Sequence, residues 1–159
     1  MRELVIRRES IESRAARDLI NELNAELSHR YPEEGANHFR LDATEVEAGR
    51  GAFLIARIEQ AAIGCGAVRR IDQSTAEIKR MYVTPKYRGQ RAGWALLERI
   101  EHVARELGVA RLVLETGVRQ PESLGLYAKY GFVRIPPFGE YMDSPLSVCM
   151  EKHLARRLK

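Results

Sequence analysis

The sequence predicts a single α/β (α+β) domain with a mixed β-sheet and helices on its faces. The chain has 159 residues, which is the length of one domain with one core. Strand-like and helix-like segments follow one another in the order β-α-β-β-β-α-β-α-β-β. Neither a low-complexity linker nor an internal repeat divides the chain. We therefore expect one domain over residues 1–159.

The first half of the chain predicts short strands around one long helix. Residues 4–8, LVIRR, are typical of a first strand. A helix is expected to begin near Ser10, because apolar side chains then recur at every fourth position. Pro32 and Gly35 end it, and the chain is expected to stay irregular or weakly helical to about Gly51. Three strands follow, at residues 52–60, 62–71 and 76–83.

The second half predicts two more helices between strands. An amphipathic helix follows residues 83–91 and stops at Gly108, a residue that favours helix ends. The apolar run ARLVLET, residues 110–116, is typical of a strand in the buried middle of a sheet. Pro121 suits the first turn of a helix that ends at Gly131. Two strands, at residues 132–135 and 146–154, close the domain around a proline-rich loop.

Composition and charge exclude several classes of protein. The chain is 45% apolar and 30% charged, as expected of a globular domain. It contains neither an apolar run of roughly 18–20 residues nor a signal-peptide pattern, so we expect a cytoplasmic protein without a membrane partner. The net charge is +4, but the cations are spread along the chain. This distribution does not predict a nucleic-acid partner.

Cysteines and histidines give no metal-binding spacing. Cys65 and Cys149 lie far apart in strand-like runs, and the four histidines are scattered. We therefore expect no metal, and we interpret the two cysteines as small, buried, reduced side chains.

Residues 83–100, VTPKYRGQRAGWALLERI, are typical of an anion site. A strand, a short loop and a helix start follow one another there, and the first N–H groups of a helix attract phosphate. Gly89 allows close approach of a ligand, and Gly93 keeps the first helical turn small. Three cations, Lys86, Arg88 and Arg91, can bind phosphate oxygens. The alternative is an ordinary loop with solvated cations.

The hexapeptide Arg88-Gly89-Gln90-Arg91-Ala92-Gly93 resembles the Gln/Arg-x-x-Gly-x-Gly/Ala signature of the GNAT superfamily of acyl-CoA-dependent N-acetyltransferases. The resemblance extends upstream to AEIKRMYVTP and downstream through LVLET to LYAKYGF, over about residues 62–134. It implies a mostly antiparallel sheet of six to seven strands, splayed in the middle. It also implies direct transfer of an acetyl group from acetyl-CoA, the cosubstrate, to a primary amine.

The resemblance implies which residues bind the cosubstrate. Met81 and Val83 would pair with the pantetheine arm through their main chain, and the Val83 N–H would polarise the thioester carbonyl. Gln120 occupies the position of a cofactor-binding asparagine of the family. The full expected set is Met81, Tyr82, Val83, Arg88, Gly89, Gln90, Arg91, Ala92, Gly93, Trp94 and Gln120. Packing against a neighbouring helix explains Trp94 equally well.

Arg91 departs from the signature, because it stands where the family carries its first glycine. A positive φ at this position would cost an arginine roughly 1–2 kcal/mol. We therefore expect a helical φ, with the guanidinium reaching a phosphate oxygen.

Two residues match catalytic positions of the family. Glu77 is the candidate general base, acting through water; the alternative is a surface glutamate paired with Lys79 or Arg70. Tyr127 is the candidate general acid that protonates the departing thiolate; the alternative is a core aromatic side chain.

The amine acceptor is expected to meet the segment after the first helix and the last loop. Candidate acceptor-binding residues are Tyr31, His38, Phe138 and Tyr141, and the alternative for the loop is a hairpin tip that only covers the core. The acceptor would be a small molecule or a peptide, and a homodimer is compatible with the sequence. A non-catalytic acyl-CoA-binding sensor and a nucleic-acid-binding domain are the alternative functions.

Overall fold

The structure, a computed structural model, describes residues 3–33 and 41–154. Its elements follow the predicted order of strands and helices. The strands are β1 (Leu4–Arg8), β2 (Gly51–Ile58), β3 (Ala61–Arg70), β4 (Thr75–Val83), β5 (Arg111–Gly117), β6 (Val133–Ile135) and β7 (Ser147–His153). The α-helices are α1 (Arg14–Arg30), α2 (Ala92–Glu106) and α3 (Pro121–Tyr130). Short 3₁₀ helices are η1 (Ala43–Val46), η2 (Pro85–Tyr87) and η3 (Gly139–Tyr141).

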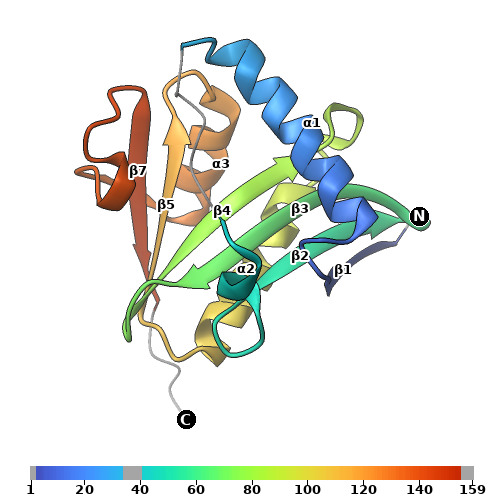
Figure 1. Cartoon of the computed structure of the whole chain (residues 1–159), viewed down its shortest axis with the longest axis horizontal. Helices are drawn as coiled ribbons and strands as arrows, with labels where there is room; N and C mark the ends of the chain where they lie inside the picture. The colour runs from blue at the N-terminus through green and yellow to red at the C-terminus, as the bar shows by residue number, and fades with distance from the viewer. Residues whose placement is uncertain (1–2, 34–40, 155–159) are drawn as a thin grey trace.

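The strands form one seven-stranded sheet in the order β1-β2-β3-β4-β5-β7-β6. Every neighbouring pair is antiparallel except β4 and β5, which run parallel. Helix α1 crosses one face of the sheet, and α2 lies on the other (Figure 1). The predicted mixed sheet with helices on both faces is confirmed.

Helix α1 begins later than the sequence predicts. Ser13, rather than Ser10, caps it: the Ser13 hydroxyl accepts a hydrogen bond from the Ala16 N–H at 3.1 Å. Residues 10–13 form a turn instead, closed by the Ser13 N–H and the Ser10 carbonyl. Ile11 extends the apolar stripe into this turn because it packs on the same core as α1.

Each face of the sheet is covered by its own apolar core. Leu19 and Leu23 of α1 pack on Phe53, Ile55 and the Tyr82 ring on one face. On the other face, the predicted stripe of α2 packs on the sheet and on α3. Full burial of a leucine or phenylalanine side chain contributes about 1.5–3 kcal/mol, so these two layers hold the helices in place.

Strand β4 contains a bulge that explains its mixed sequence pattern. Cys65 pairs with Tyr82 and Ala67 pairs with Lys79, so Gly66 of β3 faces two residues of β4. The extra residue is Arg80, whose φ is +58°. After Arg80 the alternation restarts one residue late, which places the Met81 sulfur above Gly66, where a Cβ would meet it at 2.7 Å.

The parallel pair β4–β5 opens into a gap. Pairing runs only from Thr75 opposite Arg111 to Ile78 opposite Leu114. Beyond these residues the two strands part (Figure 1). The splay that the family resemblance implies is therefore present, and it exposes the second half of one edge of β4.

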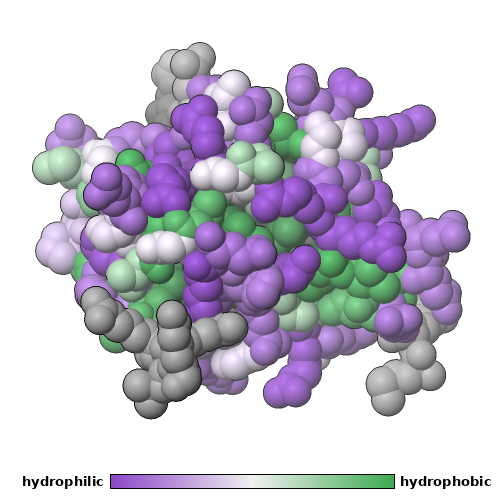
Figure 2. Space-filling view, turned by 90° about the horizontal axis from the view of Figure 1, so that it is seen from below, coloured by the Kyte–Doolittle hydropathy of each residue, from purple (hydrophilic) through white to green (hydrophobic). Residues whose placement is uncertain are grey.

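The exterior of the molecule is largely hydrophilic on the face seen in Figure 2, with apolar side chains showing across its middle. Across residues 3–33 and 41–154, none of the helices has the length and apolar character needed to cross a membrane. The same residues contain no cluster of three or more His, Cys, Asp or Glu side chains fit to hold a metal ion.

Both cysteines are buried and unbridged, as predicted. Burial raises the pKa of the Cys65 thiol to about 12, and it also raises the pKa of Cys149. Neither side chain is therefore an ionised nucleophile near neutral pH.

Candidate active site

The loop between β4 and α2 has the geometry of an anion site. Helix η2 follows β4 directly, and Gly89 then adopts a φ of +78°. Arg91 is the N-terminal cap of α2, so the first N–H groups of this helix point out of its end toward the loop. The helix has 15 residues, and its dipole adds positive potential at the same place.

Arg91 itself does not have the helical φ that we expected. Its φ is +68° and its ψ is 8°, in the left-handed region. The signature glycine of the family stands at this position, and glycine is the residue that adopts such a φ without strain. The loop therefore keeps the glycine conformation although it carries an arginine. The side chain is exposed, and its reach to a phosphate stays a prediction.

Replacing Arg91 by glycine is expected to raise the free energy of unfolding by about 0.5–1 kcal/mol, because glycine removes the strain of the left-handed φ. Chemical denaturation checks this change. The matched control is Arg99→Gly on the exposed side of α2, which is expected to lower stability by about 1 kcal/mol. A Kd for CoA that stays the same or decreases in Arg91→Gly would remove the phosphate role of the Arg91 side chain.

Arg88 fastens the loop to the rest of the domain. Its Nε donates to the Val83 carbonyl at 2.8 Å, and its Nη2 binds Glu26 of α1 at 2.8 Å. The guanidinium also stacks on the Tyr82 ring at 5.5 Å, and the Tyr82 hydroxyl donates to Glu22 at 3.3 Å. The side chains of Arg88 and Tyr82 thus hold the loop to α1, which leaves the main chain to meet a phosphate.

Gly93 and Trp94 bring α2 against α3. A Cβ at Gly93 would lie 2.9 Å from Leu126, so the missing side chain allows a close approach of the two helices. The Trp94 ring packs edge-on against Tyr130, with 4.7 Å between the ring centroids. Packing against the neighbouring helix, the alternative given for Trp94, is observed.

The exposed edge of β4 carries the main chain of Met81 and Val83. The N–H of Thr84 donates to Ile63 of β3 at 2.8 Å. Because neighbouring residues of a strand direct their main-chain groups to opposite edges, those of Val83 face the gap. Met81 lies two residues earlier and faces the same edge. The edge is therefore arranged to pair with an extended ligand.

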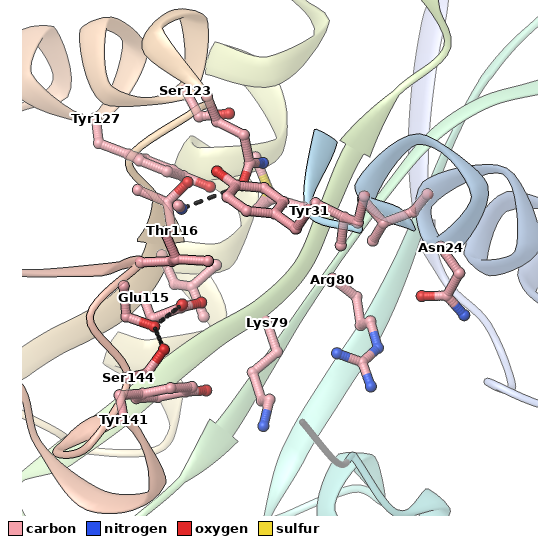
Figure 3. Close-up of a pocket in the computed structure, with 18 residues that line it drawn as sticks. Asn24, Tyr31, Lys79, Arg80, Glu115, Thr116, Ser123, Tyr127, Tyr141 and Ser144 are labelled. Carbon is pink, nitrogen blue, oxygen red and sulfur yellow. Dashed lines mark hydrogen bonds between the residues drawn. The ribbon is translucent and has the colours of Figure 1, made fainter. Parts of the chain in front are cut away.

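A cavity of about 100 Å³ lies where β4 and β5 part (Figure 3). Residues of α1, β4, β5, α3 and the segment before β7 line it. Its polar lining includes Asn24, Tyr31, Lys79, Arg80, Glu115, Gln120, Tyr127 and Tyr141. Two predicted cofactor residues (Met81 and Gln120), the predicted acid Tyr127 and two acceptor candidates (Tyr31 and Tyr141) therefore meet in one place, whereas residues 88–94 do not line the cavity.

Tyr127 lies on the α3 wall of this cavity (Figure 3). Its ring packs edge-on against Phe132 with a centroid distance of 5.8 Å, which fixes its direction. Burial raises the pKa of Tyr127 well above its usual value, so the phenol keeps its proton at neutral pH.

Glu77 is buried beside the cavity rather than on its wall. Its Oε1 accepts from Arg69 Nη2 at 2.7 Å, and its Oε2 accepts from the Tyr141 hydroxyl at 2.6 Å. The side chain is only 1% exposed, so the alternative of a surface glutamate is wrong. Its ion pair also differs from the expected one, because Arg69 stands opposite Glu77 on β3. Arg69 binds Glu45 of η1 as well.

Glu115 lies on the wall of the cavity and was missed by the sequence analysis. It follows Leu114, the last residue of β5 that pairs with β4. Its carboxylate accepts a hydrogen bond from the Ser147 hydroxyl. Burial raises the pKa of the Glu115 carboxyl above its usual range, despite the hydrogen bond from Ser147. The signal in the sequence is a single acidic residue that interrupts the apolar run ARLVLET.

Tyr31 closes the cavity from the end of α1 (Figure 3). Its hydroxyl accepts from the Arg119 N–H at 2.8 Å and lies 3.3 Å from the Gln120 side-chain oxygen. It also lies above Gly117, where a Cβ would be 1.8 Å from the hydroxyl oxygen. The Gln120 oxygen accepts from the Gly117 N–H at 3.1 Å. Tyr31 and Gln120 thus fix the turn between β5 and α3.

The other acceptor candidates differ in whether they line the cavity. Tyr141 lines the cavity and contacts Phe138, whose ring centroid is 5.3 Å away and which does not line it. The last loop is therefore both a wall of the cavity, through Tyr141, and a cover of the core. His38 lies outside the described residues.

Comparison with known proteins identifies the family. Residues 16–132 match the acetyltransferase (GNAT) family. An IAA acetyltransferase of Azospirillum brasilense is 43% identical over 155 residues, which span 97% of this chain and 100% of that protein. The crystal structure of a candidate acyl-CoA N-acyltransferase from Klebsiella pneumoniae has a TM-score of 0.83 at 31% identity, over 96% of this chain and 98% of that one. A GNAT family acetyltransferase from Elizabethkingia anophelis, with acetyl-CoA bound, shares the fold at 22% identity and a TM-score of 0.68, over 95% of this chain and 98% of that one.

Fold and sequence match together define an acyltransferase. Within that class, the chain belongs to the acetyltransferase (GNAT) family and is an acetyl-CoA-dependent N-acetyltransferase. The predicted family, fold and enzyme class are confirmed. Membership in a family of enzymes favours catalysis over the sensing module and the nucleic-acid-binding domain that the sequence left open.

Proposed function

We propose that this protein transfers the acetyl group of acetyl-CoA to a primary amine by direct attack in the gap between β4 and β5. One observation carries the proposal: pairing of the two strands ends at Ile78, and both Tyr127 and Glu115 line the cavity that opens there. Amide formation needs a base for the amine, a donor for the oxyanion and an acid for the thiolate. The described residues offer a group for each.

The cosubstrate would bind along β4 and across the start of α2. The main-chain N–H groups of residues 89–94 and the α2 dipole suit a pyrophosphate. Met81 and Val83 would pair with the pantetheine arm, because their main-chain groups face the gap. Arg88 already occupies the Val83 carbonyl, so the Val83 N–H is the group left on that residue to polarise the thioester carbonyl. The bound thioester supplies the activated acetyl group.

The base that the site supports best is Glu115 rather than Glu77. Glu115 lines the cavity, and its raised pKa suits a residue that accepts a proton near neutral pH. Both carboxylate oxygens of Glu77 already accept hydrogen bonds, one from Arg69 and one from the Tyr141 hydroxyl. These contacts support a role for Glu77 in positioning Tyr141. The sequence-based hypothesis that Glu77 acts as the base through water stays a prediction.

Proton transfers in this scheme balance. The ammonium of the acceptor gives one proton to Glu115, and the amine nitrogen then forms the bond to the acyl carbon. As the C–S bond breaks, Tyr127 donates its phenolic proton to the thiolate sulfur. The nitrogen loses its second proton, which restores the Tyr127 phenol through solvent, and Glu115 releases the first proton to solvent. Of the two protons that leave the nitrogen, one thus replaces the proton given to the sulfur and one goes to solvent.

The test is acetyl-CoA-dependent release of free thiol over a panel of primary amines, with IAA, the compound in one relative's name, assayed separately beside them. We expect release from at least one amine, and mass spectrometry should show an added acetyl group on that amine. A control without amine corrects for hydrolysis. Thermal stabilisation by CoA without release from any amine would contradict the proposal and favour a sensing module.

A further inference from the structure

The carboxylate of Glu115, the base in the proposed function, is held by a hydroxyl group. The Ser147 hydroxyl donates a hydrogen bond to Glu115 Oε2. Glu77, the other carboxylate beside the cavity, is held by the guanidinium of Arg69 at 2.7 Å. A neighbouring cation keeps a carboxyl ionised into the acid range, whereas a hydroxyl can donate to a carboxylate and accept from a carboxylic acid. A neutral partner therefore suits a carboxylate that has to take up and release a proton.

Strand β7 places the Ser147 hydroxyl beside Glu115. In the antiparallel pair of β5 and β7, Glu115 stands opposite Cys149, and Ser147 lies two residues before Cys149. Ser147 is therefore the diagonal neighbour of Glu115 on the same face of the sheet. It is buried, and both residues line the cavity. The pairing of two strands thus fixes the position of this hydroxyl.

A second hydroxyl, that of Ser144, lies 2.8 Å from the Ser147 hydroxyl, on the same side of the cavity as Glu115 (Figure 3). The Ser147 N–H also donates to the Ser144 carbonyl at 3.2 Å, so a turn of main chain holds the two serines together. A serine hydroxyl has one proton to donate and lone pairs that accept. Ser147 can therefore donate in only one of its two directions at a time.

These two directions match the two protonation states of a general base. When Glu115 is ionised, Ser144 can donate to Ser147, and Ser147 donates to the carboxylate. When Glu115 carries a proton, the carboxyl can donate to Ser147, and Ser147 then donates to Ser144. Both arrangements use the same oxygen positions, so the base changes its protonation state without losing its partner.

We propose, on the basis of the proposed function, that Ser147 is the positioning residue of the base. Its hydroxyl, supported by Ser144, holds Glu115 Oε2 in both protonation states. Oε1 is then the oxygen that meets the ammonium of the acceptor and accepts its proton. Ser147 acts through Glu115 and does not contact the reacting atoms.

Several ionisable groups surround Glu115, and their effects have to be separated from that of Ser147. Burial is the main cause that raises the pKa of the Glu115 carboxyl, and the hydrogen bond from Ser147 opposes it. The charges of Glu77 and Glu140 raise this pKa further, whereas Lys79 lowers it. Serine variants leave all these groups in place. The ionisable groups around Glu115 are Glu77, Lys79 and Arg80 on β4, Glu140 and Tyr141 before β7, Cys149 on β7, Tyr127 on α3 and Tyr31 after α1.

The first test is the pH profile of Ser147→Ala. The hydrogen bond stabilises the ionised carboxylate, so its loss raises the pKa of Glu115. The acidic decrease in kcat/KM should therefore move to higher pH, by about 1 pH unit, and kcat/KM at neutral pH should fall about tenfold. The Kd of acetyl-CoA, measured by calorimetric titration, should stay within about twofold of the wild-type value.

Three further variants show whether the hydroxyl itself is responsible. Ser147→Thr keeps the hydroxyl on a residue that suits a strand, and it should restore the wild-type pH profile. Ser144→Ala removes the support of Ser147 without changing the buried residue, and it should move the acidic decrease in the same direction by a smaller amount. Ser28→Ala, on the exposed side of α1, is the control for a lost hydroxyl and should change neither the profile nor kcat/KM.

A double-mutant cycle tests whether Ser147 acts through Glu115. If it does, Ser147→Ala should have no further effect on kcat/KM in the Glu115→Gln background. Independent, additive losses would overturn the proposal. An unchanged midpoint of the acidic decrease in Ser147→Ala, or an equal loss of activity in Ser147→Thr, would also overturn it, since both patterns indicate a purely structural role.

A measurement without turnover separates this inference from the proposed function. ¹³C NMR titration of the side-chain carboxyls of the free enzyme, with Glu115→Gln to assign the signal, should show that Glu115 titrates at higher pH in Ser147→Ala than in the wild type. Identical titration curves would overturn the positioning role while leaving acetyl transfer intact. If the wild-type enzyme acetylates no amine, the proposed function fails, whereas the titration still reports whether Ser147 controls the protonation of Glu115.

Discussion

Replacing Tyr127 by phenylalanine is expected to lower kcat by about 100-fold or more, while the Kd of acetyl-CoA stays within about twofold of the wild-type value. General acid catalysis contributes roughly 10²–10⁴-fold, and the substitution removes the one proton that Tyr127 can give. The ring stays in place, because its edge-on contact with Phe132 does not involve the hydroxyl. Single-turnover kinetics and calorimetric titration with acetyl-CoA measure the two quantities.

Tyr130→Phe is the matched control for this prediction. Tyr130 lies on the same helix, three residues further on, and its ring packs against Trp94 and under the Lys152 ammonium, 4.1 Å from the ring centroid. Removing its hydroxyl should leave kcat unchanged within about twofold. Equal turnover of Tyr127→Phe and the wild-type enzyme would exclude Tyr127 from the mechanism.

Much of the fold could be predicted because local patterns and tertiary packing agree. Apolar periodicity, together with Gly108, Pro121 and Gly131, placed the helices and strands within a few residues. The predicted start of α1 was wrong, because Ile11 belongs to the same apolar core as the helix although it lies in a turn. Periodicity reports which side chains are buried, whereas the cap at Ser13 decides where the helix begins.

The site was only partly predictable, because its unusual features depend on contacts between strands. Tyr127 and Met81 were expected from the family resemblance, and both line the cavity. The bulge at Arg80 arises because Gly66 of β3 faces two residues of β4. The sequence of β4 alone does not contain this register. In the sequence, Lys79 and Arg80 therefore look like part of a mixed strand pattern. Their meeting on one wall of the cavity is not predicted.

The main-chain conformation of Arg91 also could not be predicted from its residue type. An arginine normally indicates a negative φ, and the expectation of a helical φ followed from that preference. The structure keeps the left-handed conformation instead, since the loop and the start of α2 together fix the backbone there. The position of the residue in the signature was a better guide than the residue type.

The choice between two carboxylates can be decided by comparing Glu115→Gln with Glu77→Gln. Glu115→Gln is expected to lower kcat/KM by about 100-fold, because an amide cannot accept the proton of the ammonium. Its raised pKa means that the wild-type carboxyl holds a proton to a higher pH than an ordinary glutamate, so wild-type activity should fall as the pH drops through that value. The variant should lack this acidic decrease.

Stability provides the control for the same pair of variants. A carboxyl whose pKa is raised on folding favours the native state at low pH and disfavours it once the pH rises through the folded pKa. Glu115→Gln should therefore keep or raise the Tm at neutral pH while activity is lost. Glu77→Gln removes one charge of the buried pair with Arg69, so it should lower the Tm and weaken the contact that positions Tyr141. Wild-type activity and an unchanged pH profile in Glu115→Gln, together with loss of the acidic decrease in Glu77→Gln, would return the role of base to Glu77.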